Sequence, residues 1–172
     1  RQEGFTLIEL VVVIVILGIL AVTAAPRFLN LQDDAREASL EGLRGAVAGA
    51  MGISYGRAAI GGIEAKDYDP YVDADNIGTV IDNIAHKYGY PTAVSNGVDH
   101  LGGILQTIES SEDFVVLHSS SGTETDQTNT TIDIGLDGFT DKCVRYTAAT
   151  SEIKPATVEL VDGVSGTACG KP

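Results

Sequence analysis

The feature that most constrains this chain is an uninterrupted apolar run near its start. Residues 10–25 contain no charged side chain. As an α-helix, residues 5–25 would extend about 31 Å at about 1.5 Å per residue, which matches the roughly 30 Å hydrocarbon core of a bilayer. Glu9 is the one charged residue inside this span. A carboxylate is costly in hydrocarbon, so Glu9 is a candidate functional residue.

Three simpler explanations of the run remain open. A cleaved secretory signal would place a peptidase site at residues 22–24, but the run is long for such a signal and Glu9 interrupts its start. A plain membrane anchor leaves Glu9 without a role. A buried helix of a soluble core does not need an apolar run of this length. The pattern alone favours an anchor, with a secretory signal as the second choice.

The residues at the start of the run resemble a specific processing signal. Residues 1–10 read RQEGFTLIEL, in which a small residue and Phe precede Thr-Leu-Ile-Glu and the apolar run. This pattern resembles the type III signal of type IV pilins and type II secretion pseudopilins. The resemblance implies that a prepilin peptidase cuts between Gly4 and Phe5, that the new Phe5 amine is N-methylated, and that Glu9 is needed for filament assembly. Residues 1–4 would then be the remnant of a leader whose first part is missing.

Within this class the sequence is most similar to pilins of the mannose-sensitive haemagglutinin (MSHA) type, strongly over residues 4–55 and in architecture beyond them. The resemblance implies a structural subunit and not an enzyme. It implies an α+β type IV pilin fold, in which a long N-terminal helix packs against a four-stranded antiparallel sheet. The subunit would cross the inner membrane of a Gram-negative bacterium once before assembly and lie in a surface pilus afterwards.

Partners and alternatives follow from the same resemblance. The expected partners are copies of the chain, the prepilin peptidase and the inner-membrane assembly machinery, with a surface or carbohydrate receptor and phage as candidates. Adhesion, biofilm formation and phage attachment would be the roles of the filament. A type II secretion pseudopilin is the nearest alternative. A membrane-tethered binding or catalytic domain is a more distant one.

Size and charge set the organisation of the chain. With 172 residues it can hold one anchor and one modest domain. Residues 61–172 carry 6 Lys or Arg against 18 Asp or Glu, a net charge of −12, whereas residues 27–60 are neutral. An acidic head excludes binding to a nucleic-acid backbone, which needs a basic surface. The expected parts are the leader remnant 1–4, the transmembrane and polymerisation helix 5–26, its amphipathic half 27–60 and the acidic head 61–172.

A single long helix is predicted over residues 6–55, with a weak part in its first half. Pro26 cannot donate a hydrogen bond to the carbonyl of Val22 and should bend the helix, and Gly18 weakens it further. The resemblance implies that residues 18–26 partly unwind in a filament. Beyond Pro26, apolar residues recur at spacings of three and four, which is typical of one buried helix face: Leu40, Leu43, Val47 and Met51.

A second stripe on the same helix consists of glycine. Its spacings of three and four place its members roughly opposite the leucine face: Gly42, Gly45, Gly49, Gly52 and Gly56. Each Gly costs a helix roughly 0.5–1 kcal/mol relative to Ala, so five on one face need a reason. Close approach of another backbone is a physical reason. We expect this face to meet either the loop that follows or a neighbouring subunit, and compositional drift is the alternative.

The head is predicted to be a loop followed by a sheet. Residues 61–110 read as irregular, with a short helical turn at 82–88. Short apolar or alternating segments then predict four strands between about residues 113 and 161, connected as an antiparallel meander with one face on the helix. Asp137-Gly138 is typical of a hairpin turn.

The two cysteines, Cys143 and Cys169, suggest a disulfide, because an exported domain with an even cysteine count commonly forms one. Two buried thiols are the alternative. The bond would fasten the C-terminal tail to the sheet. The cysteines do not form a Cys-x-x-Cys or Cys/His cluster, so neither a zinc site nor a redox motif is predicted.

No cofactor, metal or catalytic group is predicted. Residues 52–56 match the Gly-x-Ser-x-Gly nucleophile motif, but they lie at the end of a helix and not between a strand and a helix, so we interpret the match as chance. The three histidines are scattered along the chain: His86, His100 and His118. Four carboxylates gather in the loop without the spacing of a calcium loop and are interpreted as solvated: Asp67, Asp69, Asp73 and Asp75.

Overall fold

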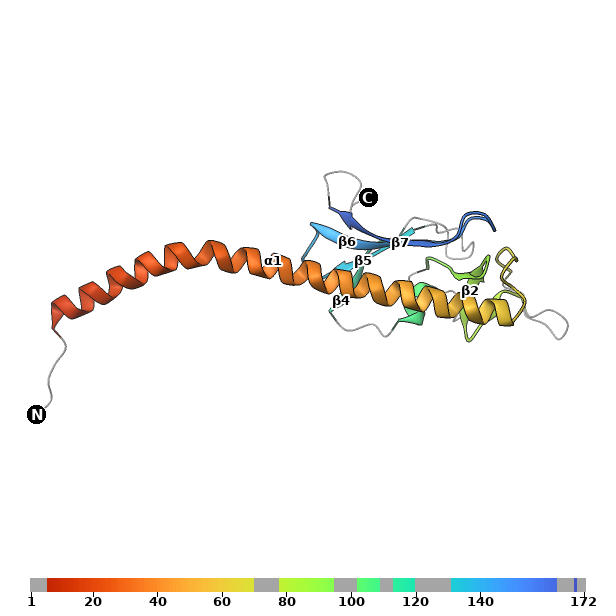
Figure 1. Ribbon diagram of the computed structural model, residues 1–172, viewed down its shortest axis with the longest axis horizontal. Coiled ribbons are helices and arrows are strands. Elements are labelled where there is room, and N and C mark those ends of the chain that lie inside the picture. Colours follow the sequence, from red (N-terminus) through yellow and green to blue (C-terminus); the bar gives the residue numbers. More distant parts are fainter. Residues whose placement is uncertain are drawn as a thin grey trace, which may run out of the picture. The chain divides into compact units, whose positions relative to one another are not determined.

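The computed structural model describes residues 6–69, 78–94, 102–108, 113–119, 131–163 and 169 (Figure 1). The side chains of residues 25–30 are not among those described. The chain divides into two compact units, Arg1–Ala38 and Ser39–Pro172. We describe each unit by itself. The long helix contributes residues to both of them.

Helix α1, Leu7–Ile60, is 54 residues long and confirms the predicted long helix, which extends five residues further than expected. It ends in a glycine cap. Gly62 has a φ of +68°, which favours glycine, and the amide of Ile63 donates to the carbonyl of Ala58 at 3.0 Å. Ile63 and Ala58 are both buried. Gly61 and Gly62 therefore end the helix at Ile60, whereas the sequence analysis placed its end near residue 55.

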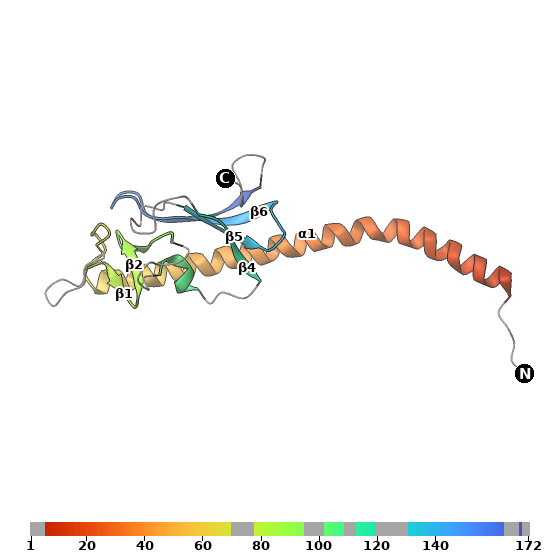
Figure 2. The same cartoon turned by 180° about the vertical axis from the view of Figure 1, so that it is seen from behind.

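In the second unit, the predicted leucine face of α1 forms the core with a four-stranded sheet. Leu40, Leu43 and Val47 are buried, and Met51 packs against the same cluster. The sheet supplies the other side of this core through its inward-facing residues: Ile132, Ile134, Val144 and Tyr146. Figures 1 and 2 show the sheet lying along the part of α1 that belongs to this unit. The helix face predicted from spacings of three and four thus packs against the sheet face predicted from alternation in the strands.

The four-stranded sheet is an antiparallel meander in the order β4-β5-β6-β7, as predicted. Its strands are β4 (Phe114–Ser119), β5 (Thr131–Leu136), β6 (Lys142–Thr147) and β7 (Thr157–Asp162). The register of β4 against β5 shifts between Val116 and His118, which is a bulge on the edge strand. Gly138, with a φ of +69°, lies in the turn predicted between β5 and β6.

The head contains a second sheet, so the predictions of a single sheet and of an irregular loop over residues 61–110 were wrong. Its three short antiparallel strands are β1 (Val80–Ile81), β2 (Ile84–Lys87) and β3 (Tyr90–Pro91). A short 3-10 helix, η2 (Ile104–Thr107), follows, and its Ile104 is fully buried.

The predicted helical turn at residues 82–88 was also wrong, because two tight hairpins occupy this stretch. Asp82 and Asn83 have φ values of +53° and +64°, and Tyr88 and Gly89 have values of +50° and +80°. Two successive residues with positive φ form the two-residue turns whose twist suits a hairpin. The apolar residues that suggested one helical face therefore lie on short paired strands.

The two sheets of the head are linked by a buried hydrogen bond. The hydroxyl of Tyr146 on β6 donates to the carbonyl of Pro91 on β3 at 2.6 Å. Tyr146 is fully buried, and burial raises the pKa of its phenol above the ordinary value. The phenol therefore stays a neutral donor at physiological pH.

Candidate functional site

The first turn of α1 fixes the carboxylate of Glu9. The backbone amide and the hydroxyl of Thr6 both donate to Glu9 Oε2, at 2.9 and 2.7 Å, and the Glu9 amide approaches the Thr6 hydroxyl at 3.4 Å. This is a capping box, and the Thr-x-x-Glu pattern of the sequence could have revealed it. Gly4 and Phe5 lie outside the described residues. The roles of Gly4 and Phe5 in processing, and of Phe5 and Glu9 in assembly, stay predictions.

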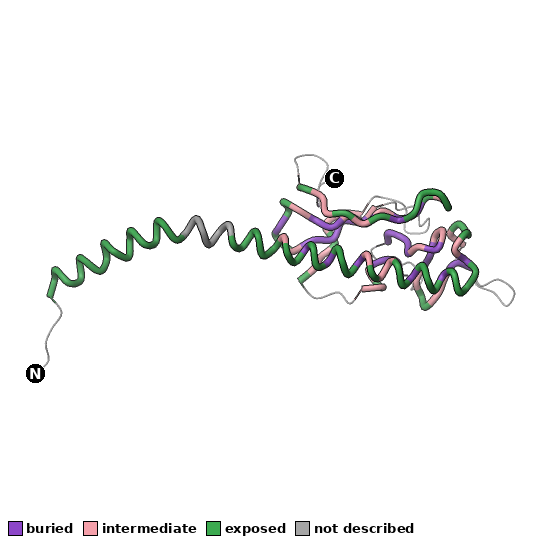
Figure 3. Tube along the Cα trace, viewed as in Figure 1, coloured by how far each residue is buried: buried purple, intermediate pink, exposed green. Residues whose placement is uncertain are grey.

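The apolar side chains that follow Glu9 are uncovered. In the described part of the chain, Leu7–Ala24 is the one helical stretch long and apolar enough to cross a membrane. Its large apolar side chains are 47% to 81% exposed, and Figure 3 shows this part of the helix as exposed throughout. A surface this apolar needs lipid or another protein as its partner.

The predicted weak part of the helix is helical in the single chain. The helix is continuous through Gly18 and Pro26. The hydroxyl of Thr23 bonds back to the carbonyls of Ile19 and Leu20, at 3.3 and 3.0 Å. Such back-bonding competes with the helix ladder and slightly destabilises it, so Thr23 adds to the weakness expected from Gly and Pro. Unwinding in a filament stays a prediction.

The glycine face of α1, defined by Gly42, Gly45, Gly49, Gly52 and Gly56, is open. At all five positions, apart from the adjacent residues and the local helix backbone, no described atom lies within 4 Å of the place that a Cβ would occupy. Ile53 and Ile60, near the same end of the helix, are 67% and 91% exposed. Of the two partners predicted for this face, the described part of the following loop does not contact it. A neighbouring subunit and compositional drift both remain open explanations.

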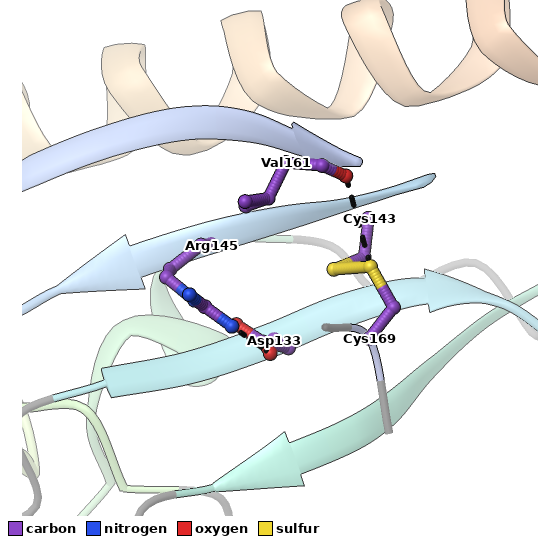
Figure 4. Close-up of polar contacts among 5 residues, drawn as sticks. All are labelled: Asp133, Cys143, Arg145, Val161 and Cys169. Atoms are coloured by element: carbon purple, nitrogen blue, oxygen red, sulfur yellow. Dashed lines mark hydrogen bonds and ion pairs between the residues drawn. A yellow bond between two sulfur atoms is a disulfide. The ribbon is translucent and has the colours of Figure 1, made fainter. Parts of the chain in front are cut away.

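The other face of the four-stranded sheet carries a disulfide and an ion pair (Figure 4). Cys143 on β6 is bonded to Cys169, as predicted, and both residues are buried. Asp133 on β5 is 1% exposed and accepts two hydrogen bonds of 2.7 Å from the guanidinium of Arg145 on β6. This contact raises the pKa of Arg145 further. Asp133 and Arg145 are opposite each other in the pairing of β5 with β6, and a bidentate pair of this kind adds geometric specificity to that pairing.

Two residues that the sequence analysis did not connect meet in the head. Ser54 Oγ of α1 lies 2.7 Å from His86 Nε2 on β2, and both side chains are buried. The other ring nitrogen, Nδ1, lies 2.9 Å from the carbonyl of Ile84 and not from a carboxylate. Ser54 is the serine of the Gly-x-Ser-x-Gly match. With a buried hydroxyl and no described carboxylate behind the imidazole, this pair lacks the arrangement of a hydrolase.

The acidic cluster of the loop is only partly described. Asp67 accepts a bond from the Tyr68 amide and lies 3.2 Å from the ammonium of Lys87. Although burial acts in the opposite direction, these two contacts hold the pKa of Asp67 below its usual value. Asp73, Asp75 and His100 lie outside the described residues. Among those described, no group of three or more His, Cys, Asp or Glu side chains could hold a metal ion.

Comparisons with known proteins agree on the N-terminal segment. Residues 1–25 match the family model described as the prokaryotic N-terminal methylation motif. The chain is 50% identical over 54 residues to the type IV narrow pilus major component PilA5 of Thermus thermophilus. That match covers 31% of this chain and 47% of the relative.

A second relative belongs to a secretion system. The chain is 45% identical over 51 residues to the type II secretion system core protein G of Pseudomonas aeruginosa, a match that covers 30% of this chain and 36% of the relative. The matched segments thus span less than half of both relatives. No solved structure is significantly similar to the chain. The chain therefore carries the methylation motif and is homologous over this segment to a pilin and a pseudopilin.

Proposed function

We propose that this chain is a structural subunit that polymerises through helix α1 into a type IV pilus. The observation that carries the proposal is the methylation motif over residues 1–25, joined to a helix whose apolar side chains over Leu7–Ala24 are exposed. Before assembly, lipid covers the segment Leu7–Ala24 and anchors the subunit in the inner membrane. In the filament, copies of α1 replace the lipid.

Processing and pairing form the first part of the proposed assembly. The prepilin peptidase cuts between Gly4 and Phe5, and the new Phe5 amine is N-methylated. That amine is the natural cation for the Glu9 carboxylate of a neighbouring chain. Transfer from lipid to a helical bundle gains little hydrophobic free energy, so packing and polar pairing select the register of the filament. Glu9 supplies the polar pairing.

The glycine face supplies the proposed packing. Five exposed glycines on one helix reduce the stability of a single subunit, and no described contact offsets this cost. Small residues allow two helices to approach closely, which strengthens dispersion contacts along their length. The inner-membrane assembly machinery would bring the subunits into this arrangement.

The finer part of the proposal rests on the sequence resemblance alone. It assigns the chain to pilins of the MSHA type, in a Gram-negative bacterium, and assigns adhesion, biofilm formation and phage attachment to the filament. The acidic head would face outward and meet a surface or carbohydrate receptor.

A type II secretion pseudopilin is the second candidate, and the similarity to core protein G supports it. Both candidates share processing, anchoring and helix packing, and they differ in where the filament lies. Surface filaments sheared from producing cells should be examined by electron microscopy and identified by mass spectrometry. A filament composed of this chain supports the pilus. If the chain is absent from sheared material and supports secretion from the periplasm, it is a pseudopilin.

A further inference from the structure

The buried contact between Ser54 and His86 joins helix α1 to the three-stranded sheet. Its two side chains come from segments far apart in the sequence and meet at 2.7 Å, with 4% and 1% exposure. Close by, the Arg57 guanidinium of α1 forms an ion pair with Asp82 in the β1–β2 turn. Both members of that pair are exposed, so it contributes little on its own. The Ser54–His86 bond is therefore the shielded polar link between the two elements.

The surrounding atoms determine the tautomer of His86. Nδ1 faces the carbonyl oxygen of Ile84 at 2.9 Å, and a carbonyl can only accept. The ring proton therefore resides on Nδ1, and Nε2 is an acceptor in the neutral imidazole. It follows that the Ser54 hydroxyl donates to Nε2. If Nε2 were protonated it would become a donor, and the Ser54 hydroxyl would have to turn and accept, so protonation reverses this bond inside a site that excludes water.

The charged groups near His86 compensate poorly for a positive ring. Asp82 is the charged side chain that acts on the imidazole, and it already pairs with Arg57 from the helix. On β2 itself, the adjacent Lys87 is a second cation, and its ammonium lies 3.2 Å from Asp67. Burial opposes a positive ring more strongly than the carbonyls of Ile84 and Thr79 and the carboxylate of Asp82 favour it.

We propose that the Ser54–His86 contact is an acid-sensitive latch, which holds the three-stranded sheet on helix α1 at neutral pH and loosens when the ring is protonated. The inference does not depend on the proposed function. Burial lowers the pKa of His86 below the ordinary 6.5, so the opened state takes up the proton first. The latch is therefore fully closed well above pH 6.5 and weakens as the pH falls through that value.

Hydrogen exchange of the full chain in detergent micelles tests the latch. Two amides report on the three-stranded sheet, namely Ala85, which donates to Gly102, and His86, which donates to Thr79. The amide of Val144 on β6 is the internal reference. After correction for intrinsic rates, lowering the pH from about 7.5 to about 5 should reduce the protection factors of the first two amides relative to that of Val144. The reduction can reach about thirtyfold, which is the value expected if the ring is protonated in the opened state and stays neutral in the closed state.

Two variants separate the latch from other acid effects. In His86→Gln the side-chain carbonyl can accept from Ser54 but does not titrate, so the relative protection should not change with pH. In Ser54→Ala the contact is absent, so protection at neutral pH should be lower and should change less with pH than in the wild type; an acid effect as large as that of the wild type would assign it to burial of the ring and overturn the latch. Equal relative protection of the wild type at both pH values overturns the proposal. A pH dependence that is unchanged in His86→Gln overturns it as well.

Discussion

Adding side chains to the glycine face should stabilise the subunit and impair its assembly. At Gly45 and Gly49, nothing described outside the local helix backbone lies within 4 Å of an added Cβ, so a substitution meets no steric clash with the described residues. Ala is favoured over Gly inside a helix by about 0.8–1.0 kcal/mol per position. Gly45→Ala/Gly49→Ala should therefore raise the free energy of unfolding by about 2 kcal/mol. At about 4 °C per kcal/mol, Tm should rise by roughly 8 °C.

Leu at the same positions separates subunit stability from packing between subunits. Leu is close to Ala in helix propensity, so Gly45→Leu/Gly49→Leu should keep most of the gain in Tm. Its branched side chains would stand on the face that we propose meets a neighbouring helix. Helices that pack through larger side chains stay about 8–10 Å apart, and a closer contact could not form. Filaments should be lost although the subunit is more stable.

The assay measures both quantities on the same variants. Tm is followed by circular dichroism of the full chain in micelles, and filaments are counted by electron microscopy after shearing. Arg44→Ala is the matched control, since Arg44 is exposed on the same helix and lies outside the glycine face. Normal filament yield from the Leu variant would refute the packing role of this face. A fall in Tm for the Ala variant would refute its openness in the single chain.

Three further predictions concern other contacts. Replacing Cys143 and Cys169 with Ser should lower the free energy of unfolding by about 3–4 kcal/mol, because the bond joins residues 26 apart; equal urea midpoints would contradict this. Glu9→Ala should leave membrane insertion intact, since it removes a charge from an apolar segment, and abolish filaments; normal filaments on the cell surface would exclude the pairing role. Tyr146→Phe should cost about 1–3 kcal/mol in the same urea titration, because the Pro91 carbonyl loses its buried donor.

Periodic patterns predicted the helix and the larger sheet well. Leu40, Leu43 and Val47 repeat at helical spacing, and Ile132 and Ile134 alternate as a half-buried strand requires. Both patterns persist over several repeats, and each indicates which side chains are buried. The disulfide followed from the cysteine count together with the exported context.

The small sheet escaped prediction because its strands are too short to show a period. β1 and β3 have two residues each, and their turns use Asp82-Asn83 and Tyr88-Gly89 in place of the common Asn-Gly signal. A single apolar pair such as Ile81 and Ile84 fits a helical face equally well.

The contact of Ser54 with His86 could not be read from the sequence either. The two residues are 32 positions apart, and neither lies in a sequence pattern that predicts a contact with the other. Only the hairpins of the small sheet bring β2 to the helix. The Glu9 cap, by contrast, is a local contact, and the pattern Thr-x-x-Glu at the start of an apolar run predicts it.

The cap at Glu9 affects how reversible the proposed polymer can be. In the single chain the carboxylate already accepts two hydrogen bonds from Thr6. Both bonds end on Oε2, so Oε1 can accept from the Phe5 amine of another chain while the cap stays in place. The apolar segment exchanges lipid for helix, a transfer that gains little hydrophobic free energy. The free energy that holds a subunit in the proposed filament would then come largely from the polar pair and from close packing, and losing these contacts would return the subunit to the membrane.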